Sequence, residues 1–261
     1  MGFTNRWVCM INLESISPKD IRSKEGIIHE EKGEAFDLRT VVKFDPPIKG
    51  EDEQIKYLTG KLYYQWEDKV KDFSISIEQA GDKAEDGKRG IQLVETMQTV
   101  RRTSIVDFWM AFNRNRKYIL FKNSKIGEAG LMNLSKLLFG DPSVIKPVEF
   151  DIQKIETDVK NGLFEGMWAF YFNGRKGSIT KGALYADITV DIEDDNMYKE
   201  AASAPKNFIG LIVELSINGK SEKVKLRVSR KGTVTIYRDL DSIDYLDTIF
   251  DVIELFEGYI I

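Results

Sequence analysis

The sequence has very few of the residues that build catalytic centres and covalent cross-links. Cys9 is the only cysteine among 261 residues, so no intrachain disulfide can form and a cysteine-based zinc site lacks its ligands. His29 is the only histidine, and it stands among Glu30, Glu31 and Glu34, a charged context typical of a solvated loop. The composition therefore predicts neither redox chemistry, nor structural zinc, nor a histidine-based catalytic centre.

Long apolar runs are also lacking. No window approaches the roughly 18 consecutive apolar residues that a membrane helix needs, and Asn5, Arg6 and Asn12 interrupt the region where a signal peptide would be apolar. Apolar residues make up 42% of the chain and charged residues 31%, a balance that favours a folded protein with a substantial core. We expect a cytoplasmic protein without a membrane segment, and the sequence leaves its oligomeric state open.

Alternation with a period of two predicts most of the secondary structure. Phe73, Ile75 and Ile77 alternate with polar residues, which is typical of a strand with one buried face. Asn173-Gly174 and Asn218-Gly219 lie between apolar stretches and favour tight hairpin turns. On the same grounds we predict strands at residues 58–66, 73–78, 105–112, 118–121, 150–155, 167–172, 183–192, 208–217, 223–228 and 233–237.

Helical periodicity is clear in two places. Leu131, Leu134 and Leu138 follow Ser124 at helical spacing and stop at Gly140. A second helix is predicted after Asp241, with the apolar positions Ile243, Leu246, Phe250, Ile253 and Phe256. The fold class expected from these patterns is α+β, with mostly antiparallel twisted sheets and two amphipathic helices.

Two segments of the chain share the same order of features. Residues 116–140 and 231–258 each run from a basic turn through a short apolar strand and a polar junction to an amphipathic helix. This order predicts two pseudo-repeated hairpin-helix halves, an N-terminal α+β half at residues 1–145 and a C-terminal one at 146–261, either separate or joined in one compact domain. Two unrelated hairpin-helix units would explain the pattern equally well.

The charge is unevenly placed along the chain. The net charge is −4, yet residues 101–126 and 215–238 each hold seven basic residues and one acidic residue, which leaves 24 basic and 40 acidic residues elsewhere. Lys223, Lys225 and Arg227 alternate with apolar residues, so we expect them in a row on the open face of one strand. The candidate nucleic-acid-binding residues are Arg114, Arg116, Lys117, Lys122, Lys223, Lys225, Arg227, Arg230, Lys231 and Tyr237.

A row of cations beside hydroxyl groups and an aromatic ring is suited to a phosphate backbone. The sequence therefore favours a non-enzymatic binding protein that contacts nucleic acid or another polyanion through basic β-hairpins, without a cofactor. Lysines that only protect open sheet faces and edges from aggregation would give the same pattern.

Two other functions fit parts of the sequence. The acidic remainder of the chain suits a protein-interaction or inhibitor protein. Asp187, Asp191 and Glu193 suit a Mg²⁺-dependent phosphodiester hydrolase, because carboxylates are the ligands that Mg²⁺ prefers. Asp187 and Asp191 would lie about 13 Å apart along a straight strand, so enzymatic activity is the less favoured interpretation.

Overall fold

In the computed structural model, the strands of the described residues form one antiparallel sheet. The described residues are 2–51, 53–78, 90–112, 114, 116–122, 126–176, 179–185 and 206–261. The strands of the first half are β1 (Thr4–Ile11), β2 (Ile28–Lys32), β3 (Asp37–Phe44), β4 (Ile48–Lys49), β5 (Ile55–Glu78), β6 (Gly90–Ala111) and β7 (Tyr118–Phe121). Those of the second half are β8 (Ile145–Pro147), β9 (Gly166–Lys176), β10 (Ile179–Tyr185), β11 (Lys206–Ile217), β12 (Lys220–Ser229) and β13 (Thr233–Ile236).

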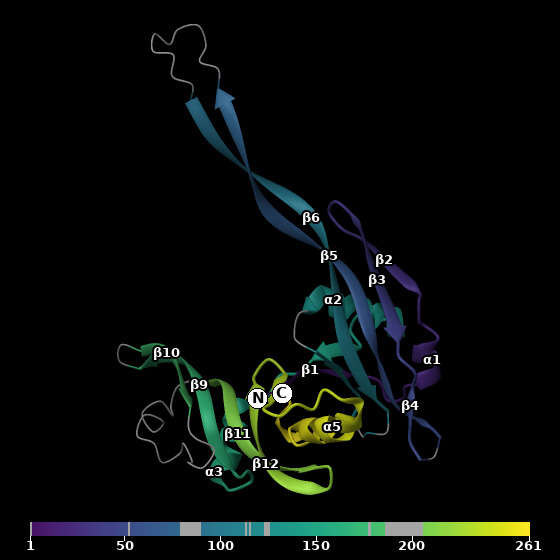
Figure 1. Cartoon of the computed structure of the whole chain (residues 1–261), viewed down its shortest axis with the longest axis vertical. Coiled ribbons are helices and arrows are strands. Elements are labelled where there is room, and N and C mark those ends of the chain that lie inside the picture. The colour runs from purple at the N-terminus through teal and green to yellow at the C-terminus, as the bar shows by residue number, and fades with distance from the viewer. Residues whose placement is uncertain are drawn as a thin grey trace.

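The strand order places β1 in the middle of the sheet. The 13 strands follow the order β10-β9-β11-β12-β13-β1-β7-β6-β5-β3-β2, with β4 beside β5 and β8 beside β1 (Figure 1). The helices in the described part are α1 (Pro18–Arg22), α2 (Gly127–Phe139), α3 (Ile152–Lys160) and α5 (Leu246–Glu254). Every strand pairing within the described ranges is antiparallel, so the α+β, mostly antiparallel class predicted from the sequence is confirmed.

The sheet carries a separate apolar core on each face, and β1 contributes to both. Trp7, Cys9 and Ile11 lie in a core that includes the buried leucines of α2. Val8 lies in the other core, together with the apolar residues of α3 and α5. Because neighbouring residues of a strand point to opposite faces, α2 covers one face of the sheet and α3 and α5 cover the other.

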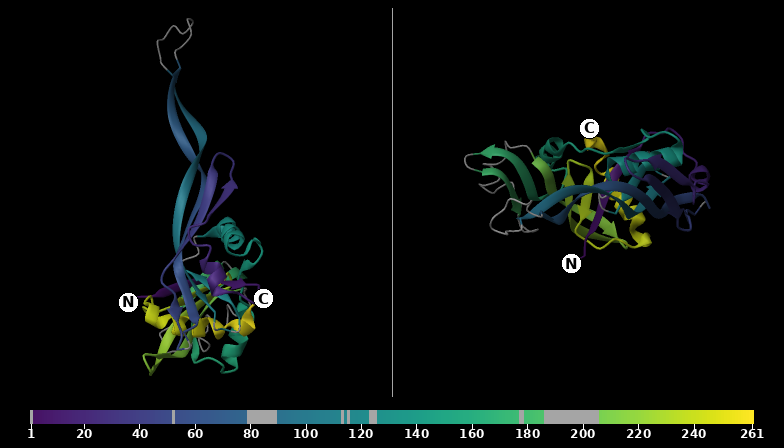
Figure 2. Two further views of the ribbon diagram at one scale, coloured as in Figure 1. Left: turned by 90° about the vertical axis from the view of Figure 1, so that its right-hand side faces the viewer. Right: turned by 90° about the horizontal axis from the view of Figure 1, so that it is seen from above.

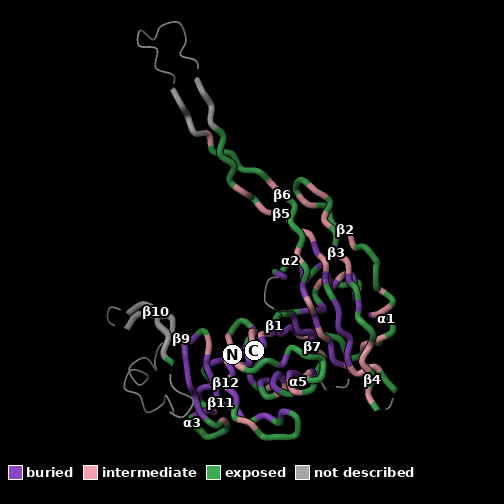
Figure 3. The backbone as a smooth tube through the Cα atoms, in the orientation of Figure 1, coloured by how far each residue is buried: buried purple, intermediate pink, exposed green. Residues whose placement is uncertain are grey.

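A long two-stranded arm projects from this body. Strands β5 and β6 pair continuously from Tyr57↔Ala111 to Glu78↔Gly90. Their ends in the body are buried. The turn between β2 and β3 still contacts the arm at Glu67 and Lys69, and beyond residue 69 the two strands rise away from the body (Figures 1 and 2). The tube of this arm is mostly exposed, in contrast to the buried strands of the body (Figure 3). The sequence predicted two separate strands at 58–66 and 73–78; the structure joins them into one.

The turn predicted at Asn218-Gly219 is correct. Asn218 has φ 51° and Gly219 has φ 73°, the left-handed conformation that a two-residue hairpin of this kind requires. The turn joins β11 to β12, which pair from Ile217↔Lys220 to Phe208↔Ser229. The predicted hairpin of 105–112 and 118–121 is also present, with Phe108 opposite Phe121.

The turn predicted at Asn173-Gly174 is wrong, because β9 runs on to Lys176 and Asn173 pairs with Lys181 of β10. The strand predicted at residues 150–155 is also wrong. The Asp151 side chain accepts a hydrogen bond from the Lys154 backbone N–H and caps α3. Ile152, Ile155 and Val159 then recur at helical spacing on the buried side, which was the signal that the sequence reading missed.

Helices α2 and α5 lie in the two regions where the sequence predicted helices, but the described part of the chain also contains α1 and α3, so the predicted set of two amphipathic helices is not confirmed. Helix α2 ends at Gly140, whose φ is 79°, as the sequence predicted. The last helix starts later than Asp241, because a single 3₁₀ turn at Ile243–Tyr245, capped by Ser242, precedes α5. Helices α1 and α3 were not predicted.

Candidate nucleic-acid interface

Arg114, the first residue of the first basic group, lies against helix α5 and is neutralised there. The Arg114 guanidinium is 2.6 Å from Asp251, 2.8 Å from Glu254 and 3.3 Å from Asp247, and its side chain is only 13% exposed. It follows β6, so it joins the arm-bearing half of the sheet to the last helix.

Its neighbours in the first group are engaged in the same region. Arg116 lies 3.8 Å from Glu257 and donates a hydrogen bond to the Glu257 carbonyl. Lys117 donates to the carbonyl oxygen of Arg114 at 2.7 Å, and Lys122 pairs with Asp241 at 3.0 Å. This group therefore has a structural role within the chain.

The ionisation of these groups is set by their partners. Burial alone would lower the pKa of Arg114, but its hydrogen bonds with Tyr57 and Asp251 outweigh burial and raise that pKa. Burial alone would raise the pKa of Asp247, but the bonds from Lys56 and Tyr57 hold that pKa below its usual value. The pKa of Asp241 is lowered in the same way, against the effect of burial, by Arg6 and Lys122.

The second basic group occupies one face of β12. Lys223, Lys225 and Arg227 alternate with Val224, Leu226 and Val228, which belong to the core under α5. The three cations therefore point to the face opposite α5, as expected from the sequence. The structure does not bring the two basic groups together, since the first lies beside α5 and the second on the other face of the sheet.

Aromatic rings lie directly under two of these cations. The Lys225 ammonium is 5.0 Å from the centre of the Trp168 ring, and the Arg227 guanidinium is 5.4 Å from that of Phe208. Tyr237 meets Trp168 edge-on at 5.0 Å, and Tyr171 stacks on Phe208 at 5.6 Å. We call this set the aromatic–cationic face; its residues are Trp168, Tyr171, Phe208, Lys225, Arg227 and Tyr237.

The strands position this face through close backbone packing. A Cβ added to Gly210 of β11 would lie 2.7 Å from the Trp168 ring, so glycine is what allows the indole to lie across β11. The Trp168 N–H donates to the Leu226 carbonyl at 2.9 Å, which fixes the ring. Arg227 reaches Thr235 of β13 at 3.4 Å.

The remaining candidates lie around this face or at its end. Lys223 pairs with Glu165 at 2.6 Å. Arg230 and Lys231 are exposed in the turn between β12 and β13. Among the described residues, neither Lys225 nor Arg227 has an ion pair with a carboxylate.

Sequence reasoning found the cations and Tyr237 but missed the rings beneath them. Trp168 is only 5% exposed, yet its ring lies under the Lys225 ammonium. The alternation of Phe208, Gly210 and Ile212 on the outer side of β11 was a signal that this strand faces the same way as the cations. The contacts themselves depend on the β9–β11 pairing, which the sequence did not reveal.

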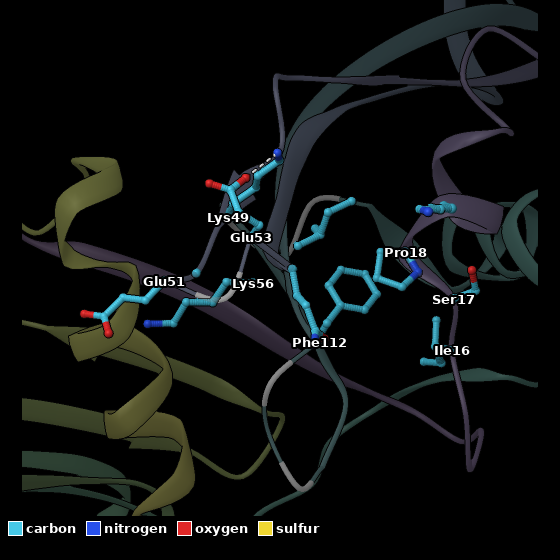
Figure 4. Close-up of a pocket in the computed structure, with 12 residues that line it drawn as sticks. Ile16, Ser17, Pro18, Lys49, Glu51, Glu53, Lys56 and Phe112 are labelled. Carbon is cyan, nitrogen blue, oxygen red and sulfur yellow. Dashed lines mark hydrogen bonds and ion pairs between the residues drawn. The ribbon is translucent and has the colours of Figure 1, made fainter.

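A cavity of about 990 Å³ lies elsewhere, between the start of α1 and the β4–β5 hairpin. Figure 4 shows Lys49 and Glu53 joined to each other among the residues that line it, which also include Pro18 and Phe112. Lys56 in its lining pairs with Asp247 at 2.7 Å. Lys49, Glu53 and Lys56 are therefore paired within the chain.

No cluster of three or more metal-ligating side chains occurs in the part of the chain that the structure describes. Asp187, Asp191 and Glu193, the proposed Mg²⁺ ligands, lie outside the described residues. The described helices include none with the length and apolar character needed to cross a membrane.

Comparison of the chain with protein-family models and with curated protein sequences finds no match.

Proposed function

We propose that this protein binds single-stranded nucleic acid on the aromatic–cationic face. The observation that carries the proposal is the placement of Lys225 and Arg227 over aromatic rings, with no carboxylate pairing to either among the described residues. Cations in this position are available to phosphates, whereas Arg114 is engaged by α5 and Lys122 by Asp241, which precedes that helix.

In this proposal the cations bind phosphates and an aromatic ring stacks on the bases. Lys225 and Arg227 would neutralise phosphates and release condensed counterions, which supplies affinity that falls with salt. Tyr237 is partly exposed on the same face, and an aromatic ring there can stack on an unpaired base. Duplex bases are already stacked on one another, so this arrangement favours a single strand.

The test is the double variant Lys225→Gln/Arg227→Gln, measured by fluorescence anisotropy with labelled single-stranded DNA and RNA over a salt series. We expect affinity to fall roughly tenfold or more at low salt. The slope of log affinity against log salt should become shallower by about 1.4, since each neutralised phosphate contributes about 0.7 for single strands.

Lys43→Gln is the matched control, because Lys43 is an exposed cation of β3 in the other half of the sheet. It should bind as the unchanged protein does. A second variant, Tyr237→Leu, should weaken single-strand binding by about 1–3 kcal/mol while leaving the salt slope unchanged, because it removes stacking and no charge. Absence of binding, or equal losses in the double variant and in Lys43→Gln, would overturn the proposal.

A further inference from the structure

The arm of β5 and β6 exposes an unpaired strand edge. From Glu67↔Arg101 to Glu78↔Gly90 the two strands pair only with each other, over about 36 Å at 3.3 Å per residue. The outer edge of β6 meets β7 only at Phe108–Met110, so in the described structure its backbone groups from residue 94 to residue 106 pair with no third strand. Isolated two-stranded ribbons are marginally stable in water, and long open edges are templates for another strand.

Apolar side chains on the arm are also uncovered. Phe73 is 54% exposed and Met97 is 59% exposed. The alternation around Phe73 predicted a strand with one buried face, but nothing within the described part of the chain buries it. The arm therefore has both an open edge and apolar surface for a partner.

The order of charged residues along β6 favours a second copy of β6 as that partner. In an antiparallel pair, two residues that lie opposite each other both direct their backbone N–H and C=O groups towards the partner strand, or both direct them away from it. When a strand pairs with its own copy, this condition holds only if one residue lies opposite the same residue of the copy. The two-fold axis passes through that residue. A two-fold at Gln98 places Glu95 opposite Arg101 of the second copy, and Arg101 opposite its Glu95. Both ion pairs form at once, in a closed, isologous contact.

The equivalent pairing of β5 is disfavoured by charge. With the axis at Val70, Lys69 would lie opposite Lys71 and Asp68 opposite Asp72, so like charges would repel. With the axis at any of these four charged residues, that residue would lie opposite its own copy and repel it. The base of the β5 edge is also occupied, because the Glu67 carboxylate accepts the backbone N–H groups of residues 34–36.

We propose that this protein forms a two-fold dimer by antiparallel pairing of the β6 edges of two arms, centred on Gln98. Glu95 is bonded to Lys71 at 2.5 Å and keeps a second oxygen for the partner. Arg101 is exposed and lies 5.5 Å from the ring centre of Phe36, with no ion pair among the described residues. The dimer is independent of the aromatic–cationic face.

The decisive test is charge reversal, with the mass measured by light scattering and the dissociation constant by sedimentation equilibrium on the full chain. Arg101→Glu and Glu95→Arg should each raise the dimer dissociation constant roughly tenfold or more, because each places like charges opposite twice. An equimolar mixture of the two variants should form a heterodimer, since every opposed pair then regains opposite charges. Arg102→Glu is the matched control, because it alters the charge equally but opposes Val94 in this register; it should still dimerise.

Cysteine cross-linking tests the axis without altering charge. Gln98→Cys should form an interchain disulfide on oxidation with diamide, because residues opposite each other have Cα atoms about 4.5–5.5 Å apart. Thr103→Cys, which would lie opposite Leu93, should not cross-link efficiently, and the native Cys9 is buried. A monomeric protein at all concentrations, or equal cross-linking at positions 98 and 103, would overturn the proposal.

Discussion

At the scale of single residues, Arg114 shows how a basic cluster can serve the fold. Its guanidinium meets three carboxylates of α5 and lies near the hydroxyl of Tyr57 from β5. One side chain thus joins the helix that covers the second half of the sheet to the base of the arm. The sequence showed that the region was basic, but the acidic face of α5 that neutralises it is 130 or more residues away along the chain, beyond the reach of any local pattern.

Arg114→Met should therefore lower the free energy of unfolding by about 1.5–3 kcal/mol, the usual range for hydrogen bonds to charged groups. Urea denaturation followed by tryptophan fluorescence would measure this. Arg116→Met is the comparison: its ion pair is 3.8 Å long and its side chain is 47% exposed, so we expect a loss below about 1 kcal/mol. Equal losses in both variants would contradict this role of Arg114.

The same contacts predict a dependence on pH. The pKa values of Asp241 and Asp247 are lowered in the folded protein by their cationic partners, which outweigh burial. A lowered folded pKa contributes stability that is fully present above the unfolded value of about 4 and is lost as the pH falls through the folded value. The urea concentration at the unfolding midpoint should therefore decrease as the pH is lowered from about 5 to about 3, roughly one pH unit either side of the unfolded pKa. This decrease should be smaller in Asp247→Asn. An identical fall in that variant would exclude Asp247 as a contributor.

At the scale of elements, the sequence predicted hairpins well where turn chemistry and alternation agreed. Asn218-Gly219 lies between two strands of matched alternation and forms the turn. Asn173-Gly174 has the same dipeptide but lies inside a longer strand, because the β9–β10 pairing extends past it. The segment 150–155 is short and apolar, a pattern compatible with either a strand or a helix. The Asp151 side chain caps the N-terminus of α3 and so stabilises the helix.

Close packing between β3 and β5 gives a further prediction at this scale. A Cβ on Gly60 would lie 2.3 Å from the Lys43 carbonyl oxygen and 3.1 Å from the Phe44 Cα, both backbone atoms that cannot rotate away. Gly60→Ala should cost about 1–3 kcal/mol of stability by pushing these strands apart. Gly258→Ala, where an added Cβ meets nothing within 4 Å, should differ little in thermal denaturation. A Gly60 variant as stable as the Gly258 variant would contradict this packing.

At the scale of the whole molecule, the arm contributes little to the body that bears it. Beyond residue 66 its strands pair only with each other. Replacing residues 70–98 with Asn-Gly, so that Lys69 and Thr99 flank a two-residue hairpin turn, should therefore shift the melting temperature of the monomeric body by less than about 4 °C. Calorimetry would show this. A large loss would mean that the arm supports the body.

The global arrangement was the least predictable part of the structure. The sequence indicated strands, helices and two basic windows, but the two windows end on different faces because α2 and α5 cover opposite sides of one sheet. The period-two alternation indicates which residues of one strand share a face of the sheet. It does not indicate whether the corresponding residues of another strand lie on the same face. The candidate site could be predicted only as far as its β12–β13 hairpin, where cations, Thr235 and Tyr237 are close in sequence.

The central position of β1 has a kinetic consequence. Its ladder with β13 joins Thr4 to Ile236, and its ladder with β7 joins Trp7 to Phe121. Closing such loops costs chain entropy before the contacts repay it, so ordering the middle of the sheet should be a late and slow event. In stopped-flow refolding, fluorescence from Trp7 should recover after the β11–β12 hairpin, whose ends are neighbours, has already gained its protection from hydrogen exchange.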